Sequence, residues 1–131
     1  MSESVLAELR NDKPSKDDRR VLNFQYKGYI VIVGRNSFTN ERIVEEHKTK
    51  HSDCLWMHAM AARGSHVILC LHGLAAPDED VVQYAAARAL ENSHSQARTV
   101  SISLLRDVFK PEDAGIGIWK TSRSMSVEVP G

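Results

Sequence analysis

Residues 53–71 constrain the fold more than any other part of the sequence, because two apolar segments lie close together there. The second segment, residues 67–71, is an unbroken apolar run, which is typical of a strand buried on both faces. In the first segment, residues 54–59, side chains of a strand alternate between two faces, so that Trp56 and His58 share one of them. We therefore expect two strands joined by a short connection, one of them in the core.

A cluster of polar and aromatic side chains accompanies these strands. Rigid strands hold the groups of a site in place better than loose loops do. We therefore expect the cluster to project onto one solvent-reachable surface that attracts anions, alongside Arg35. Its members are Trp56, His58, Arg63, Ser65 and His66.

Length and charge limit the class of protein. A chain of 131 residues with 42% apolar residues suits a single domain with its own core. Its 17 basic and 17 acidic residues give a formal net charge of zero. This balance argues against a protein that coats nucleic acid by charge alone, although a local basic patch is compatible with it.

The cysteines and the apolar runs favour a cytoplasmic protein. Cys54 and Cys70, the only cysteines, both lie in apolar strand segments, which suits buried thiols in a reducing compartment. The longest strictly apolar runs have five residues, whereas a membrane-spanning helix needs about 20. The N-terminus also lacks an apolar signal region, so we expect no membrane partner.

The sequence divides into a polar N-terminal segment, residues 1–20, and one domain, residues 21–131. The N-terminal segment has five basic and five acidic residues, which is typical of a solvated tail. At the start of the domain, residues 21–34 predict a hairpin that turns at Lys27 and Gly28.

Two helices and several further strands follow. The first helix is expected from about residue 37 to 50, capped by Ser37 or Thr39. The second starts with acidic residues 78–80 and has a stripe of small apolar side chains, namely Val82, Ala85, Ala86, Ala89 and Leu90. Further strands are expected at residues 99–104, 116–120 and 125–129. The predicted class is α+β: a single domain with a mainly antiparallel sheet and two principal helices packed on it.

Three motifs occur in an order that resembles the NFACT-R domain family over about residues 21–130. The combination is specific, although each motif alone is weak. The motifs are Val33-Gly34-Arg35-Asn36 with Asn40, then Leu55-Trp56-Met57-His58-Ala59, then Gly64-Ser65-His66-Val67-Ile68.

The resemblance implies a stand-alone RNA-binding module for tRNA or ribosomal RNA. Larger members of the family act in ribosome quality control, and stand-alone forms have been linked to tRNA-modifying enzymes. A translation or tRNA-modification protein is therefore an expected partner, and we expect no cofactor and no metal. One departure is the acidic character of residues 110–115, Lys-Pro-Glu-Asp-Ala-Gly, where the family often has a Lys-Pro-Gly-like segment.

The first motif has both functional and structural interpretations. Arg35 either holds a phosphate or stacks on a base, or it forms a salt bridge with Asp53 or Glu41. Asn36 and Asn40 either bind RNA or satisfy the turn between strand and helix, and the turn role is favoured for Asn36.

The other two motifs leave similar alternatives. Trp56 is either a stacking platform or a core residue. His58 and His66 are expected to meet across neighbouring strands, where the pair contacts phosphate, carries a proton, binds a metal or forms structural hydrogen bonds. Arg63, Gly64 and Ser65 form either an anion site or an ordinary turn.

Three functions follow from these alternatives, and we favour the first. It is a non-catalytic RNA-binding module that uses the motif residues. The second is an enzyme acting on RNA, with His58 and His66 as acid and base and Asp53 or Arg35 as orienting group. The third is an adaptor that docks a protein through a sheet edge or the helix at residues 40–50. The sequence makes no prediction of the oligomeric state.

Overall fold

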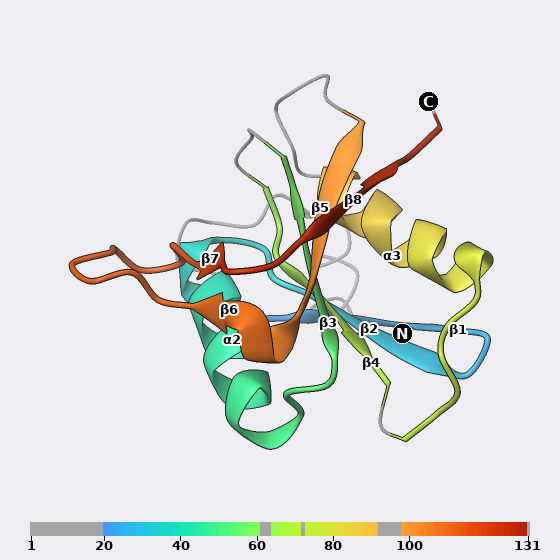
Figure 1. Ribbon diagram of the computed structural model, residues 1–131, viewed down its shortest axis with the longest axis horizontal. Helices are drawn as coiled ribbons and strands as arrows, with labels where there is room; N and C mark the ends of the chain where they lie inside the picture. Colours follow the sequence, from blue (N-terminus) through green and yellow to red (C-terminus); the bar gives the residue numbers. More distant parts are fainter. Residues whose placement is uncertain (1–19, 61–63, 72, 92–97, 131) are drawn as a thin grey trace, which may run out of the picture.

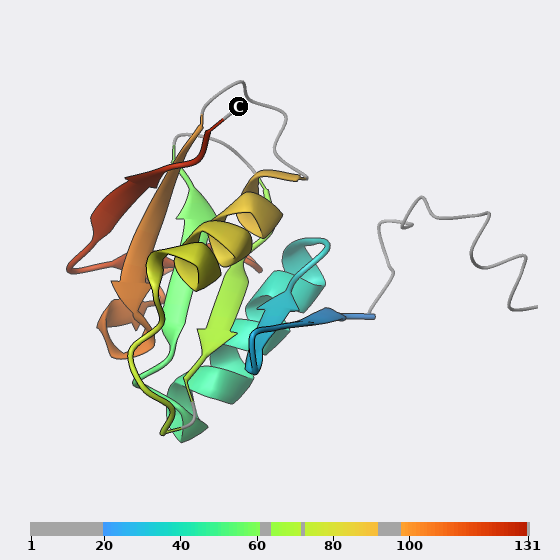
Figure 2. The same cartoon turned by 90° about the vertical axis from the view of Figure 1, so that its right-hand side faces the viewer.

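The computed structural model describes residues 20–60, 64–71, 73–91 and 98–130. These residues form a six-stranded antiparallel sheet with one helix on each face, which confirms the predicted α+β class (Figure 1 and Figure 2). The strand order across the sheet is β1 (Leu22–Tyr26), β2 (Tyr29–Val33), β4 (Val67–Cys70), β3 (Leu55–Ala59), β5 (Thr99–Leu104) and β8 (Met125–Glu128). The predicted segment at residues 1–20 lies outside the described residues except for Arg20.

The hairpin of β1 and β2 turns where the sequence predicts. Lys27 and Gly28 both have positive φ, at 50° and 86°, which is the conformation of a two-residue type I′ turn. Tyr26 therefore pairs directly with Tyr29 across the two strands. Glycine at the second position accepts this conformation without strain.

The two strands of residues 53–71 lie at the centre of the sheet. All four residues of β4 are buried, and the strand runs between β2 and β3. Leu55 pairs with Leu69 across β3 and β4. The expected core strand is thereby confirmed, and Cys54 and Cys70 are buried free thiols, as predicted.

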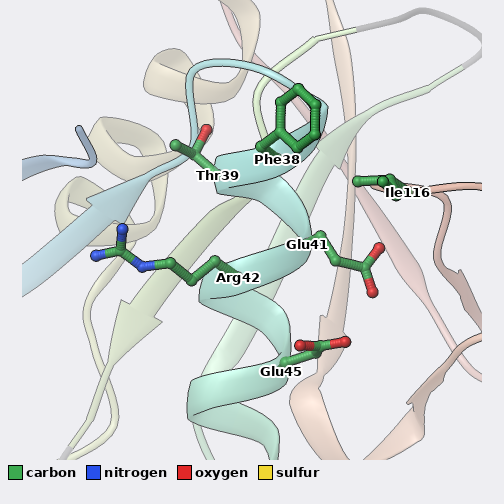
Figure 3. A pocket seen from close by; sticks show the side chains of 6 residues that line it. All are labelled: Phe38, Thr39, Glu41, Arg42, Glu45 and Ile116. Carbon is green, nitrogen blue, oxygen red and sulfur yellow. The ribbon is translucent and has the colours of Figure 1, made fainter. Parts of the chain in front are cut away.

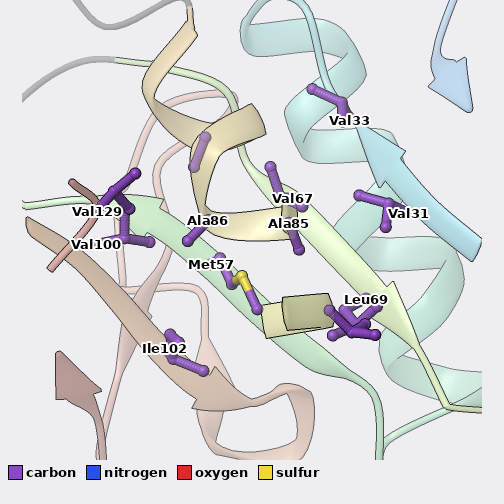
Figure 4. Packing of buried hydrophobic residues seen from close by; sticks show 12 residues of the cluster. Val31, Val33, Met57, Val67, Leu69, Ala85, Ala86, Val100, Ile102 and Val129 are labelled. Carbon is purple, nitrogen blue, oxygen red and sulfur yellow. The ribbon is translucent and has the colours of Figure 1, made fainter. Parts of the chain in front are cut away.

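Helix α3 (Glu79–Glu91) covers one face of the sheet. Its small residues allow the helix to approach the strands closely, and Ala85, Ala86 and Ala89 are fully buried against a core that includes Met57 (Figure 4). The stripe is rotated slightly from the prediction, because Val81 is buried whereas Val82 is only half-buried.

Helix α2 (Ser37–Lys50) covers part of the opposite face with the thin apolar stripe of Ile43 and Val44. The helix begins at Ser37, but the predicted cap at Ser37 or Thr39 is wrong, because Asn36 is the N-cap. The Asn36 side chain accepts from the N–H of Thr39 at 3.0 Å, and the Thr39 hydroxyl accepts from the N–H of Asn36 at 2.9 Å. This reciprocal pair satisfies two donors of the first turn.

The chain between β5 and β8 forms an arm beside α2 (Figure 1). A 3₁₀ turn, η1 (Leu105–Asp107), leads into β6 (Val108–Phe109), which pairs with β7 (Lys120–Thr121). The strand predicted at residues 116–120 is wrong except at its last residue. Gly117 has φ of 82° and packs against Ser37, where an added Cβ would lie 2.9 Å from backbone atoms, so the segment turns instead of extending.

Neither helix in the described part of the chain combines the length and the apolar character needed to cross a membrane.

Candidate nucleic-acid interface

Most of the predicted site residues meet at the N-terminus of α2. Arg35 and Asn36 follow β2, Asn40 lies in the second turn of α2, and residues 64–66 lead into β4. The backbone N–H of Gly34 donates to the carbonyl of His66 at 2.9 Å, which holds the two segments side by side. Motifs that are separate in the sequence are therefore brought together at one place in the fold.

Asn40 joins the helix to the start of β4. Its Oδ1 accepts from the backbone N–H of His66 at 3.0 Å, and its Nδ2 donates to the carbonyl of Gly64 at 3.4 Å. The side chain is only 7% exposed, so these bonds account for a buried amide. The structure thus gives Asn40 a structural role at this joint.

The joint that Asn40 makes between α2 and the start of β4 also explains why residue 34 is glycine. A Cβ added at Gly34 would lie 2.1 Å from Oδ1 of Asn40 and 3.0 Å from its backbone nitrogen. Only glycine leaves room for Asn40 to reach both of its partners.

Arg35 is presented beside a positive helix end. The Thr39 hydroxyl accepts from the N–H of Arg35 at 2.7 Å, which fixes the backbone at this residue. The first turn of α2 contains no acidic residue, so the partial positive charge of the helix N-terminus is not offset there. The Arg35 guanidinium and this helix end together can attract an anion.

An aromatic cluster lies behind the joint. The Trp56 Nε1 donates to Nδ1 of His66 at 3.3 Å, and the rings of His58 and His66 are 4.6 Å apart. The predicted meeting of the two histidines across neighbouring strands is confirmed. Trp56 also stacks on His58 with ring centroids 5.8 Å apart.

Both imidazoles are neutral at pH 7. Burial lowers the pKa of His66 to about 3, and the nearby charges of His58 and Lys110 act in the same direction. Burial also lowers the pKa of His58. Because Nδ1 of His66 accepts a hydrogen bond, its proton lies on Nε2. The pair therefore offers hydrogen bonds and no positive charge.

The expected exposure of the cluster is wrong for three residues. Trp56 and His66 are each 4% exposed and Ser65 is 2% exposed. The reason is that Trp56 packs in the apolar core beneath α2, and His66 lies under the joint made by Asn40. Arg63 lies outside the described residues. The partly exposed members are Arg35, Asn36, His58 and Gly64.

Asp53 is separated from the rest of the predicted site. It lies before β3, whereas His58 lies near the opposite end of that strand. The three residue steps of β3 from Leu55 to His58 alone span about 10 Å. Asp53 therefore can neither orient the imidazole pair nor reach Arg35, which lies at the His66 end of the sheet.

Glu41 holds the arm against α2, a contact that the sequence did not predict. Its Oε1 accepts from Nζ of Lys110 at 2.5 Å and from the N–H of Gly117 at 2.6 Å. Burial opposes ionisation of Glu41, but the bonds from Lys110 and Gly117 prevail and lower its pKa. Lys110 also lies 5.1 Å above the ring of Trp119. Its ammonium group is thus already engaged, which together with the acidic residues of this loop disfavours a phosphate contact there.

A shallow pocket of about 300 Å³ separates α2 from the arm (Figure 3). Figure 3 shows Glu41 and Glu45 on the side of α2 that faces Ile116, with Arg42 pointing the other way. A hydrogen bond with Glu41 raises the pKa of Glu45. Two carboxyl groups in contact make this pocket a poor site for phosphate, so we do not include it in the interface.

Comparison with known proteins identifies the family. Residues 20–115 match the family described as the NFACT protein RNA binding domain. A solved structure of the C-terminal part of the fibronectin/fibrinogen-binding protein from Streptococcus suis has a similar fold, with a TM-score of 0.72 and 23% sequence identity. The match covers 96% of this chain but only 54% of the Streptococcus suis chain, so this chain spans about half the length of the chain in that structure. The search of curated proteins found no match.

The family match covers well over half of the 131 residues and includes all three motifs. The family supports RNA as the class of partner. The chain belongs to the NFACT protein RNA binding domain family.

Proposed function

We propose that this chain binds RNA at the Arg35 corner, which we define as Arg35, Asn36, Ser37, His58 and Gly64. The observation that carries the proposal is the positive N-terminus of α2, free of acidic residues in its first turn, with Arg35 directly before it. Backbone N–H groups at a helix N-terminus and arginine side chains are common partners of RNA phosphates.

The other predicted site residues are proposed to support this corner. Asn40 fixes the start of β4 through its bond with the backbone N–H of His66, and Trp56 positions the His66 ring. Ser65 is buried between Gly64 and His66. Buried side chains of this kind keep exposed groups in a defined place. Arg63 stays a predicted RNA contact.

The resemblance to the family suggests the finer assignment. We propose that the RNA is tRNA or ribosomal RNA, and that the protein acts in the cytoplasm in ribosome-associated quality control or in tRNA modification. A zero net charge gives only a weak general attraction to RNA, so we propose that a translation or tRNA-modification protein contributes to RNA binding as well.

Replacing Arg35 by alanine is expected to weaken binding of tRNA or ribosomal RNA fragments about tenfold, because a charge-assisted phosphate contact is lost. The slope of log affinity against log salt should also become shallower by roughly one unit. Fluorescence anisotropy with labelled RNA across a salt series measures both quantities.

Arg106→Ala is the matched control, since it removes the same charge at the far end of α2. Arg106 lies beside Lys48 of the last helical turn, about 20 Å from Arg35 along a helix of 14 residues. We expect this variant to bind RNA as the wild type does. Equal loss in both variants would place the phosphate contacts elsewhere, and no RNA binding by the wild type would rule out the proposed function.

A further inference from the structure

A row of polar side chains crosses the sheet face that α2 covers only in part. His58 of β3 pairs with Ser101 of β5, and Ser101 pairs with Ser126 of β8. On the other side of β3, the ring of His58 contacts His66. We call these four residues, His66, His58, Ser101 and Ser126, the polar row.

The polar row starts at the Arg35 corner and leads into solvent. The N–H of Gly34, which precedes Arg35, bonds the carbonyl of His66 at its inner end. His66 is buried, His58 and Ser101 are half-exposed, and Ser126 is exposed. Four strands at the usual spacing give the row a length of about 14 Å, which is enough for a short stretch of a nucleic-acid strand.

The chemistry of the row does not suit phosphate. Both imidazoles are neutral, and the two serines contribute only hydroxyl groups. At the next residue pair on this face of β5 and β8, the hydroxyl of Thr99 donates to the carboxylate of Glu128. The negative charge of that carboxylate repels phosphate. Hydroxyl and neutral imidazole groups match a partner that both donates and accepts hydrogen bonds without charge.

Strand β5 carries another serine on the face of the polar row. Ser103 lies on the same face as Ser101, opposite Trp56, and is 4% exposed. In the described part of the chain its Oγ has no hydrogen-bond partner. An apolar side chain would be less costly at such a position, so packing alone does not explain the hydroxyl.

We infer that the solvent-accessible part of the polar row, His58, Ser101 and Ser126, binds the ribose 2′-hydroxyls of a single-stranded RNA segment, while Arg35, Asn36, Ser37 and Gly64 of the Arg35 corner hold the phosphates. The 2′-hydroxyl is an uncharged donor and acceptor, and it is the group that distinguishes RNA from DNA. Ser101 and Ser126 therefore determine the preference for RNA. This inference rests on the proposed function, which supplies the nucleic acid.

The double variant Ser101→Ala with Ser126→Ala tests the inference. We expect about tenfold weaker binding of a single-stranded RNA of about 16 nucleotides and unchanged binding of the DNA with the same sequence. Anisotropy titrations with labelled RNA and labelled DNA give the ratio of RNA affinity to DNA affinity. This ratio should fall toward one in the double variant. Ser52→Ala is the control, because Ser52 is an exposed serine at the other end of β3. Thermal unfolding confirms that all variants are folded.

The outcomes separate this inference from the proposed function. If the wild type binds RNA and DNA equally, or if the double variant keeps the RNA preference, the polar row does not bind ribose. A protein partner would then be the alternative occupant of this face of the sheet. Equal loss of RNA and DNA binding would also overturn the inference, because it would show contacts to phosphate or base. If the wild type binds neither strand and no tRNA, the proposed function fails as well.

Discussion

Replacing Gly34 by alanine is expected to destabilise the domain by about 3 kcal/mol, because the new Cβ would overlap Asn40. The added atom would lie 2.1 Å from Oδ1 of Asn40 and about 3 Å from its backbone. Relieving the overlap requires either moving the first turns of α2 or breaking the bond from Asn40 to His66. Urea denaturation, followed by circular dichroism, measures the free energy of unfolding.

Gly115→Ala is the matched control for this substitution. A Cβ at Gly115 would meet only Ile118, at 4.0 Å, and its φ is not positive. Its free energy of unfolding should change by less than about 0.5 kcal/mol. If Gly34→Ala were as mild as Gly115→Ala, the joint between β2, α2 and β4 would not be as tight as the structure shows.

Lowering the pH from 7.5 to 5 is expected to cost the wild type about 2 kcal/mol of unfolding free energy through His66 alone. The pKa of His66 is about 3 in the folded protein and near 6.5 when unfolded, so the unfolded chain binds more protons in this window. The stability from neutral His66 is therefore complete above pH 6.5 and is lost as the pH falls toward 3. His58, whose pKa burial also lowers, acts in the same direction.

Denaturation at several pH values tests this linkage. His66→Gln should be less stable at pH 7.5 and should show a clearly shallower fall toward pH 5, because the buried titrating group is absent. Ser52→Ala changes an exposed side chain that carries no titratable group and should keep the wild-type slope. A wild-type stability that does not change between pH 7.5 and pH 5 would show that His66 protonates freely and is not sealed in the interior.

Local patterns in the sequence were enough to predict much of the fold. Alternation identified β1 and β3, an unbroken apolar run identified β4, and the turn at Lys27 and Gly28 followed from residue type. The N-cap at Asn36 was missed because Ser37 and Thr39 are equally good caps by type, and only the reciprocal bonds decide between them. The turn at Gly117 depends on packing against Ser37, 80 positions earlier in the chain, which no local pattern reveals.

The candidate site was predictable in its composition but not in its exposure. Strand alternation placed Trp56 and His58 on one face, and the two histidines do meet. Whether a side chain on that face is buried depends on α2 and on the arm, and these come from distant parts of the sequence. The pairing of Glu41 with Lys110 is of the same long-range kind.

The motifs that identify the family are therefore largely structural in this protein. Gly34, Asn36 and Asn40 build the joint, and Trp56 and His66 fill the space behind it. Their combined effect is to hold Arg35 and the start of α2 in one place. A sequence motif can thus set the position of an exposed residue even when most of the motif lies beneath the surface.

The most direct test of an RNA interface at the Arg35 corner is to follow the backbone amide resonances of the labelled protein by NMR during titration with tRNA. We expect the largest shifts at residues 34–37, at Gly64, and along the polar row at His58 and Ser101. The exposed side of α3, on the opposite face of the sheet, should be unaffected. Shifts concentrated on α3 and β1, with none at residues 34–37, would contradict the proposed interface.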